Sequence, residues 1–467
     1  MNSLFKFKTL SLLVTATVGS LITTHAFADN AVPHTKTPKN IIYVVGDGMG
    51  PAYTTAYRNF IDNPETPVVE RTIFDKILVG GASTTSSNTG PATPHDDEHH
   101  TRNIYVTDSA AAATALSAGI KTYNGAIAVN DNKQPVRTVM EYAKSLDKTT
   151  AIVVTSEINH ATPASFVSHN DYRRNYPDIA NDFIDNRVNG KPIVDLMLGG
   201  GTEDFVREDR NIANEFKALG YQYLNKFDDI GTLSFPALGL FAPRGLPFAI
   251  DDPANPHRLA NMVSHALPVL DSNSPNGYFM LVEGSQIDWC GHANDIACAM
   301  REMDDFAQTI EHLVNYVDTH PDTLLVITAD HSTGGLTIGA DGNYFWRPAV
   351  LNDVKASAGK MAEEGLKNDD IVAFVQEKTG VTPTEEQAKA LKAAQDKAQK
   401  SGKTWDLHKA IAHVVDVASN TGWTTTGHTG VDVQVFAYGQ SSQGFIGSQD
   451  NTDLAKKLFK ILEASDH

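Results

Sequence analysis

Five short apolar runs constrain the fold of this chain more than any other feature of its 467 residues. They are rich in Val, Ile, Leu and aromatic residues and comprise Ile41–Val45, Ala151–Val154, Tyr278–Val282, Thr323–Thr328 and Val433–Tyr438. Runs without polar alternation are typical of strands that are covered on both faces of a mostly parallel sheet. Helical patterns such as Thr138–Ser145 and Arg301–Val317 lie between them. The alternation predicts an α/β fold in which a large, mostly parallel central sheet is flanked by helices.

The composition changes near Asp353. Residues 353–420 are rich in Ala, Lys, Glu and Gln, which favour helix, so we expect a helical insertion on the α/β core, as a lid or surface excursion. Within it, Thr382 is expected to cap a helix, because Pro383 then occupies the first helical position and Glu385 stands three residues after the cap.

The first 28 residues have the pattern of a secretory signal peptide. Lys6 and Lys8 precede the apolar run Leu10–Ile22, and Ala26-Phe27-Ala28 forms an A-x-A cleavage site. The run is short for a membrane anchor, and no later segment is long and apolar enough to span a bilayer. The mature chain, residues 29–467, is therefore expected to be secreted, into the periplasm of a host with two membranes.

Charge and cysteine content narrow the possible partners. The formal net charge of −18 argues against a nucleic-acid-binding surface and against anionic membranes, so an anionic substrate requires local positive charge from Arg or metal. Cys290 and Cys298 can pair in an oxidising compartment, but on one continuous helix they would stand roughly 12 Å apart, too far for a disulfide. Whether they pair stays open at this point.

The stretch VTDSAAAATALSAG, residues 106–119, has the pattern of a strand end, a turn and a helix. Asp108 and Ser109 carry oxygens that accept the free N–H groups of a first helical turn, and Ala110 to Leu116 favours helix. A lone serine in this position is usually an N-cap. It can instead be a nucleophile, because the positive end of a helix dipole is also where phosphate binds. The stretch alone does not decide between the two interpretations.

Acidic and histidine residues gather at the ends of four apolar runs. Asp47 follows the first, Glu283, Asp288 and His292 follow the third, Asp330 and His331 follow the fourth, and His428 precedes the fifth. Ligands of open α/β sheets bind outside the carboxyl ends of the strands. Asp and His are ligands of Zn²⁺, and all-oxygen sets suit Mg²⁺, so the pattern favours a multi-metal centre over scattered structural polar residues. The glycines around Asp47 have the spacing G-x-G-x-G, which does not match the dinucleotide-binding pattern.

Six motifs occur in one order along the chain: VGDGMG (45–50), VTDSAAAATALSAGIKTYNGAI (106–127), HATPA (160–164), EGSQIDWCGH (283–292), TADHSTGG (328–335) and HTG (428–430). In this order they resemble the motifs of alkaline phosphatases, from about Asn40 to the last apolar run. The resemblance implies that residues 29–467 form a catalytic domain that includes the 353–420 insertion. It further implies a large mixed sheet, a homodimer, and hydrolysis of phosphate monoesters at alkaline pH through a phosphoserine.

The resemblance also implies a role for each site residue, with two Zn²⁺ and one Mg²⁺ per chain. Ser109 matches the nucleophile, Arg173 the phosphate-binding arginine and Asp108 the residue that orients it; Asp288, His292 and His428 match the ligands of one zinc, Asp47, Asp330 and His331 those of the other, and Asp47, Thr162 and Glu283 those of magnesium. Two positions depart from the enteric-bacterial form, which has Asp in place of His160 and Lys in place of Trp289. Both are expected to lie directly behind metal ligands.

Three other functions are alternatives to a phosphomonoesterase. A sulfatase needs Cys or Ser in a C/S-x-P-x-R context, whereas Ser109 is followed by three alanines. A non-catalytic, metal-dependent phosphate-binding protein would be favoured if the nucleophile were missing, and Ser109 is present. A phosphodiesterase side activity stays open.

Overall fold

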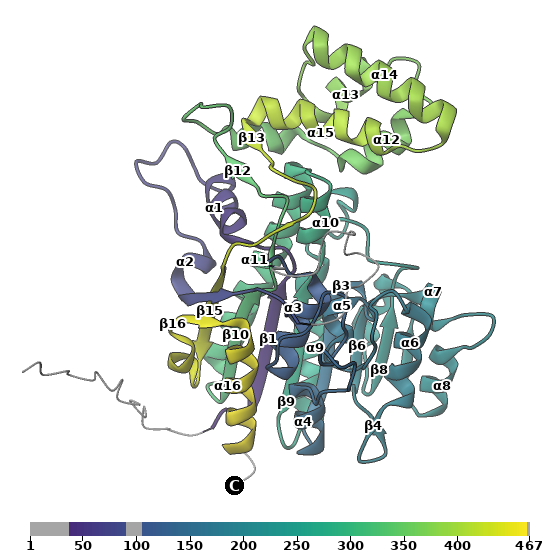
Figure 1. Cartoon of the computed structure of the whole chain (residues 1–467), viewed down its shortest axis with the longest axis vertical. Coiled ribbons are helices and arrows are strands. Elements are labelled where there is room, and N and C mark those ends of the chain that lie inside the picture. Colours follow the sequence, from purple (N-terminus) through teal and green to yellow (C-terminus); the bar gives the residue numbers. More distant parts are fainter. Residues whose placement is uncertain (1–36, 90–104, 465–467) are drawn as a thin grey trace, which may run out of the picture. The chain divides into compact units, whose positions relative to one another are not determined.

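A ten-stranded sheet forms the centre of the computed structural model, which describes residues 37–89 and 105–464 (Figure 1). The predicted signal peptide, residues 1–28, lies outside the described residues. The strands of the sheet are β1 (Asn40–Gly46), β2 (Leu78–Ser83), β3 (Thr149–Glu157), β6 (Leu196–Gly200), β7 (Gln222–Leu224), β8 (Ala237–Leu240), β9 (Tyr278–Gly284), β10 (Thr323–Ala329), β15 (Val433–Gly439) and β16 (Gly447–Asp450).

The strand order is β16-β2-β15-β10-β1-β9-β3-β6-β8-β7. The five apolar runs form β1, β3, β9, β10 and β15, and side chains of β1, β3, β9 and β10 are buried throughout. As described, β15 runs antiparallel to both of its neighbours, and the other pairings of this sheet are parallel. The predicted fold class, a large and mostly parallel sheet flanked by helices, is confirmed.

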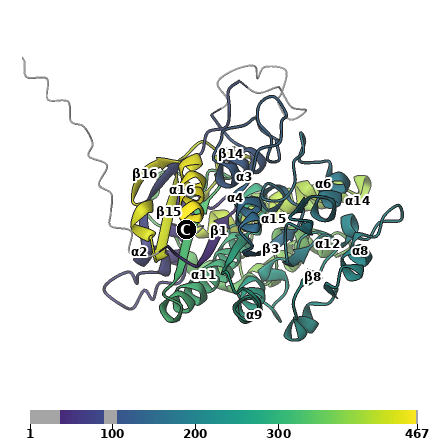
Figure 2. The same cartoon turned by 90° about the horizontal axis from the view of Figure 1, so that it is seen from below.

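Helices cover both faces of the sheet. Figure 2 shows α3, α4 and α16 on one side and α9 and α11 on the other. The helices outside the insertion are α1 (Pro51–Phe60), α2 (Ile73–Ile77), α3 (Ser109–Ala118), α4 (Val139–Ser145), α5 (Ala161–Ala164), α6 (Tyr176–Asp185), α7 (Thr202–Phe205), α8 (Ile212–Ala218), α9 (Arg258–Asn273), α10 (Gln286–His292), α11 (Ile296–Thr319) and α16 (Asn451–Ala464). Among the residues that the structure describes, the insertion included, no helix combines the length and apolar character needed to cross a bilayer.

Four helices occupy residues 358–419: α12 (Ala358–Gly365), α13 (Ile371–Thr379), α14 (Glu385–Ser401) and α15 (Trp405–Ser419). The cap predicted for α14 is wrong by two residues. Thr384, rather than Thr382, accepts the N–H of Gln387 at 3.2 Å, while Gln387 accepts the N–H of Thr384 at 2.9 Å. This reciprocal pair satisfies two free donors, and it requires Pro383 to precede the cap.

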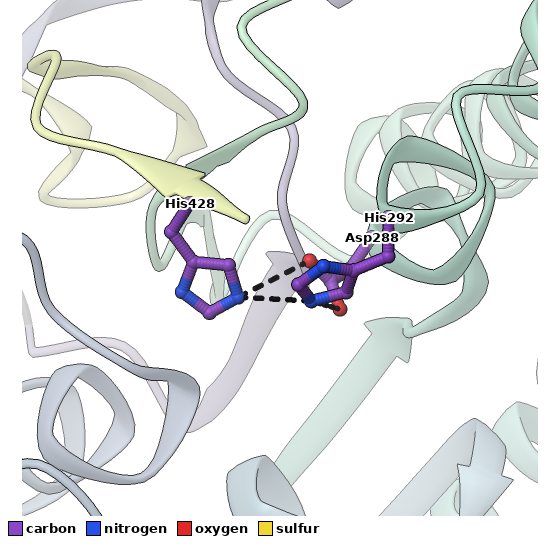
Figure 3. Close-up of side chains that lie close together, drawn as sticks. All are labelled: Asp288, His292 and His428. Atoms are coloured by element: carbon purple, nitrogen blue, oxygen red, sulfur yellow. Dashed lines mark hydrogen bonds and ion pairs between the residues drawn. The ribbon is translucent and has the colours of Figure 1, made fainter. Parts of the chain in front are cut away.

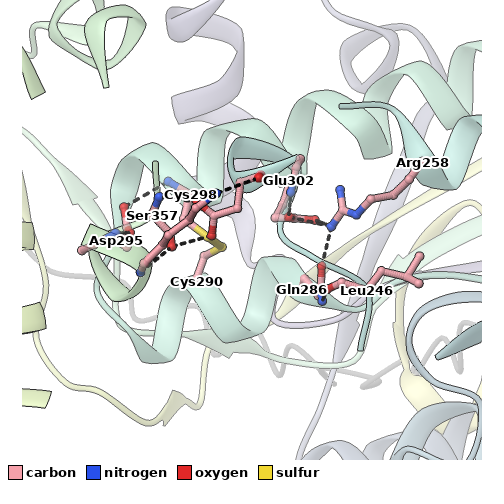
Figure 4. The surroundings of a disulfide bond; sticks show 12 residues. Leu246, Arg258, Gln286, Cys290, Asp295, Cys298, Glu302 and Ser357 are labelled. Carbon is pink, nitrogen blue, oxygen red and sulfur yellow. Dashed lines mark hydrogen bonds and ion pairs between the residues drawn. A yellow bond between two sulfur atoms is a disulfide. The ribbon is translucent and has the colours of Figure 1, made fainter. Parts of the chain in front are cut away.

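Cys290 and Cys298 form a disulfide, with Cα atoms 5.5 Å apart (Figure 4). The condition that would have kept them apart, a single continuous helix, is not met, because α10 ends at His292 and α11 begins at Ile296. Asp295 caps α11 by accepting the N–H of Cys298, and its other oxygen accepts the N–H of Ala358 in α12. The turn after α10 is thereby joined to the insertion.

In the described ranges, three two-stranded ribbons lie outside the sheet: β4 (Arg187–Val188) with β5 (Lys191–Pro192), β11 (Ser332–Thr333) with β14 (His428–Thr429), and β12 (Thr337–Ile338) with β13 (Thr421–Gly422). The last two connect the segment after β10 with the segment that leaves the insertion. They bring His331 and His428, which are far apart in sequence, to one edge of the sheet.

Candidate active site

The register of three central strands brings the predicted acidic residues together. Gly46 of β1 pairs with Gly284 of β9 and with Ala329 of β10, so Asp47, Glu283 and Asp330 lie at the same carboxyl edge. Because β15 is antiparallel, the residues before it start from this edge, which explains why His428 precedes its strand. The structure brings together seven of the predicted ligands, and the hydroxyl of the eighth, Thr162, lies beside Glu283; the seven are Asp47, Glu283, Asp288, His292, Asp330, His331 and His428.

Within the described part of the chain, carboxylate oxygens and imidazole nitrogens form three groups whose ligand atoms lie within 4.8 Å of one another. The groups are Asp288, His292 and His428; Asp47, Asp330 and His331; and Asp47, His160 and Glu283. Asp47 belongs to two of them, so the sites adjoin through one carboxylate. Such His and carboxylate sets are the ligands that divalent cations accept in proteins.

In the first group, α10 places Asp288 and His292 one turn apart, and His428 approaches from the facing strand β14 (Figure 3). His292 Nε2 lies 3.3 Å from Asp288 Oδ2 and 3.1 Å from His428 Nε2. Each Nδ1 contacts a backbone carbonyl, that of Thr426 at 2.6 Å and that of Thr107 at 2.8 Å. Since a carbonyl only accepts, Nδ1 carries the proton and the Nε2 lone pair faces the centre of the group.

Two carboxylate oxygens of the second group and the hydroxyl of Ser109 meet at a single nitrogen, His331 Nε2. Asp330 Oδ2 lies 3.0 Å away, Asp47 Oδ1 3.5 Å and Ser109 Oγ 3.1 Å. In a Ser-His-Asp relay the carboxylate would contact the opposite ring nitrogen, but His331 Nδ1 lies 3.3 Å from the hydroxyl of Thr333. The arrangement therefore suits a metal ligand and does not form a proton relay.

The third group tests directly whether the site fits a cation. Both oxygens of fully buried Asp47, and Oε1 of Glu283, have no hydrogen-bond partner within the described part of the chain. Burial, with the nearby carboxylates of Asp330, Asp288 and Glu283, raises the pKa of Asp47, and burial raises the pKa of Glu283 to about 8 even though the Ser285 and Thr162 hydroxyls lower it. Buried anions without counter-charge are costly, so bound cations are the complement this group requires.

Ser109 is the first residue of α3, and Asp108 is its N-cap: Asp108 Oδ1 accepts the N–H of Ala111 at 2.9 Å. The interpretation of Ser109 as a simple cap is therefore wrong, and its hydroxyl points to His331 instead. The other oxygen of Asp108 accepts from Arg173 Nη1 at 3.0 Å. One carboxylate thus fixes both the start of the helix and the guanidinium beside it.

His160 and Trp289 pack against each other, with ring centroids 5.8 Å apart, and Phe248 lies on Trp289 at 6.4 Å. His160 lies closer to the metal groups than its sequence position predicts, because it can itself supply a ligand atom beside Asp47 and Glu283. Burial and the charge of Arg173 lower the pKa of His160 to about 3, so its ring is neutral.

The groups that orient the predicted ligands are not among the residues predicted from the sequence. They are the carbonyls of Thr107 and Thr426 and the hydroxyl of Thr333, which donates to Asp288. Thr107 and Thr333 lie inside the quoted motifs, but a carbonyl direction leaves no trace in residue type.

The fold and these groups define a metal-binding hydrolase of α/β architecture. The sequence profile of the alkaline phosphatase family matches residues 38–464. Alkaline phosphatase 3 of Bacillus subtilis is 46% identical over 430 residues, which cover 91% of this chain and 89% of that protein. The repressible alkaline phosphatase of Saccharomyces cerevisiae is 31% identical over 501 residues, covering 94% and 83%.

Among solved structures, the cold-active alkaline phosphatase of Shewanella sp. matches with a TM-score of 0.81 at 43% identity, covering 91% of this chain and 99% of that one. The chain belongs to the alkaline phosphatase family, and its activity is the hydrolysis of phosphate monoesters.

Proposed function

We propose that the chain hydrolyses phosphate monoesters through a phosphoserine formed on Ser109, with two Zn²⁺ and one Mg²⁺ beside it. The observation that carries the proposal is the position of Ser109 Oγ, at a helix start and 3.1 Å from a nitrogen on which two carboxylates also converge. Asp288, His292 and His428 would hold one zinc, and Asp47, Asp330 and His331 the other. Asp47, Thr162 and Glu283 would hold magnesium, with His160 beside them.

The bound cations would supply Lewis-acid stabilisation of the negative charge that develops on the attacking and leaving oxygens. In the crystal structure of one relative, a variant of the TAB5 alkaline phosphatase in which a histidine is replaced by aspartate has Mg bound in its M3 site. The third group of this chain, with two carboxylates and one imidazole, has the donors for a comparable cation.

The chain's own residues bind and orient the phosphoryl group. Arg173 presents a planar fork that pairs with two phosphate oxygens, and Asp108 holds that fork in place. Backbone N–H groups at the start of α3 face the same anion. The Ser109 hydroxyl loses its proton as Oγ forms a bond to phosphorus and the ester P–O bond breaks, and the leaving alkoxide takes up a proton to become the alcohol. Water then attacks the phosphoserine, which restores the hydroxyl and releases inorganic phosphate.

We also propose that the mature chain is exported, to the periplasm in a host with two membranes, and that it works as a homodimer. The N-terminal pattern with Lys6, Lys8 and the Ala26-Phe27-Ala28 site supports export. The dimer rests on the family resemblance alone, and light scattering of the purified protein tests it.

Substitution Ser109→Ala tests the mechanism. We expect turnover to fall by orders of magnitude, because the acceptor oxygen is gone, while elemental analysis still finds about two zinc and up to one magnesium per chain. Quenching the wild-type enzyme at acid pH during turnover should trap phosphate on Ser109. Phosphate on another residue would overturn the nucleophile assignment, and a fully active enzyme with one metal per chain would overturn the metal assignment.

A further inference from the structure

One segment, residues 423–429, contains one histidine of the first metal group, contacts the other, and borders the loop that carries His331 of the second. Its last residues form β14, in which His428 pairs with Thr333 of β11, two residues after His331. Its carbonyl at Thr426 orients His292. The position of this segment therefore decides whether His292 and His428 face each other, and it borders the loop that carries His331.

Trp423 is the first residue of this segment, and it packs on the loop after His331. A Cβ built on Gly334 would lie 2.6 Å from Cε3 of the Trp423 ring, so the ring touches the glycine backbone directly. Gly334 also accepts the N–H groups of Thr424 and Thr425 through its carbonyl, and it donates its own N–H to Gly427 at 2.8 Å. Trp423 and these bonds join the two loops into one unit.

The indole of Trp423 is in turn held by the helical insertion. Trp423 Nε1 donates to Asp416 Oδ1 at 3.1 Å, and Asp416 is a buried residue of α15. Only three residues separate the end of α15 from Trp423, so the insertion leads directly into the segment. Burial raises the pKa of Asp416 well above its ordinary value, which is opposed by the indole N–H. Burying the carboxyl group of Asp416 for one side-chain hydrogen bond is costly. Because that bond holds the indole of Trp423, it fixes the position of residues 423–429 relative to α15.

We propose that Asp416 and Trp423 are positioning residues through which the helical insertion fixes the zinc ligands His292 and His428. The inference rests on the proposed function only in taking those two histidines as zinc ligands. It gives residues 353–420 a role in holding metal, and it predicts a defect that appears in metal retention before it appears in folding.

The experiment measures zinc release from the zinc-loaded full-length enzyme into excess coloured chelator, 4-(2-pyridylazo)resorcinol, together with far-UV circular dichroism and thermal unfolding of each metal-free variant. Trp423→Ala and Asp416→Ala should release zinc about 10–100-fold faster than wild type, the usual cost of losing a group that orients a ligand. Asp416→Asn keeps an acceptor oxygen and should restore slow release. Trp423→Phe keeps an aromatic ring against Gly334 but loses the N–H, so its rate of zinc release should lie between those of the wild type and Trp423→Ala.

Trp405→Ala is the matched control, because Trp405 begins the same helix α15 with 45% of its surface exposed. It should release zinc at the wild-type rate. If Trp423→Ala does not fold, Trp423→Phe and Asp416→Ala decide. Release at the wild-type rate by folded Trp423 and Asp416 variants would overturn this inference.

His428→Ala separates that failure from failure of the proposed function. If wild type binds zinc and His428→Ala loses about one equivalent, the ligand assignment stands whatever the Trp423 variants do. If His428→Ala keeps all of its zinc, the proposed function itself is wrong.

Discussion

Two buried clusters of charge lie along α10, and they are neutralised in opposite ways. At its start, Gln286 joins Arg258, Glu302 and Asp305 (Figure 4 shows Arg258, Glu302 and Gln286), all no more than 3% exposed. Arg258 reaches both oxygens of Glu302 at 2.7 Å and Asp305 Oδ2 at 3.1 Å. The backbone N–H of Ala249 donates to Glu302, and those of two residues of α9 donate to Asp305.

The metal groups, reached further along the same helix, have no such cation. Among residues 37–89 and 105–464, no Lys or Arg forms an ion pair with Asp47, Glu283 or Asp288, and both oxygens of Asp47 have no hydrogen-bond partner. The contrast teaches that a buried carboxylate cluster with its own arginine is structural, whereas a cluster without one is built for cations from solution.

Metal removal should have the largest effect, because the metal groups depend on bound cations whereas the cluster around Arg258 does not. Dialysis against EDTA should abolish phosphatase activity and lower the unfolding temperature, because each cation present at 1,000 times its Kd contributes about 4 kcal/mol of stability. Calorimetry before and after chelation, and again after Zn²⁺ and Mg²⁺ are restored, measures both effects. An unchanged unfolding temperature would show that the unpaired carboxylates do not need cations.

Arg258→Met breaks the cluster that supplies its own cation. Two buried carboxylates then lose their counter-charge, and we expect the free energy of unfolding of the metal-free protein to fall by about 3–5 kcal/mol. Urea unfolding followed by circular dichroism measures it. Adding Glu302→Gln and Asp305→Asn should recover part of the loss, because the uncompensated charge is removed.

Asp47→Asn is the corresponding substitution in the metal groups, and it should change the stability of the metal-free protein in the opposite direction. Removing a charge that has no partner should stabilise the metal-free protein, while the metal-loaded protein loses stability and zinc. If Asp47→Asn destabilised the metal-free form as Arg258→Met does, the contrast between the clusters would be wrong.

The residues that the sequence predicts well are those whose position follows from strand ends. Parallel strands align their carboxyl ends, so Asp47, Glu283 and Asp330 converge once their runs are recognised as strands. The apolar content of these runs is itself the physical signal, because strands covered on both faces exclude polar residues.

The remaining features depend on where helices end and on tertiary contacts, which residue type does not encode. The disulfide follows from the turn at residues 293–295, and no proline marks that turn. The approach of His160 to Asp47 depends on the path of the chain after β3, and the contact of Trp423 with Asp416 depends on how α15 packs. In each case tertiary structure selects among local conformations that the sequence permits.

Adding negative charge to the third metal group, formed by Asp47, His160 and Glu283, should have a smaller effect than the preceding substitutions. His160→Asp places a third carboxylate beside Asp47 and Glu283, so magnesium affinity should rise about tenfold. Trp289 packs on His160, which lies next to Arg173, so Trp289→Lys adds positive charge near the proposed phosphate-binding arginine. This should strengthen the binding of inorganic phosphate and slow turnover where phosphate release is limiting. Magnesium titration by calorimetry and phosphate inhibition constants measure the two effects. His160→Asn, with the shape of aspartate and no charge, is the control; unchanged constants in both variants would show that these positions do not tune the site.

The smallest effect concerns the pair of His169 and Glu141, because His169 loses its positive charge as the pH rises. His169 Nε2 lies 2.9 Å from Glu141 Oε1, and its Nδ1 lies 2.8 Å from the carbonyl of Ala128. Burial opposes charge on the ring, but Glu141 and that carbonyl outweigh it and raise the pKa of His169 above 6.5. A raised histidine pKa gives stability that is complete below pH 6.5 and is lost as the pH rises through the folded-state value.

A double-mutant cycle with His169→Gln and Glu141→Gln, run by urea unfolding at pH 6 and pH 9, measures this pair. The coupling should be on the order of 1 kcal/mol at pH 6 and smaller at pH 9, because a neutral ring keeps its contacts but not its charge. Glu141 also accepts the N–H of Thr138 at the start of α4, and the cycle cancels that contribution because it is present with either residue at 169. Equal coupling at both pH values would mean that the imidazole is neutral throughout. The pair would then not be an example of a cluster that supplies its own cation, because a neutral imidazole carries no positive charge.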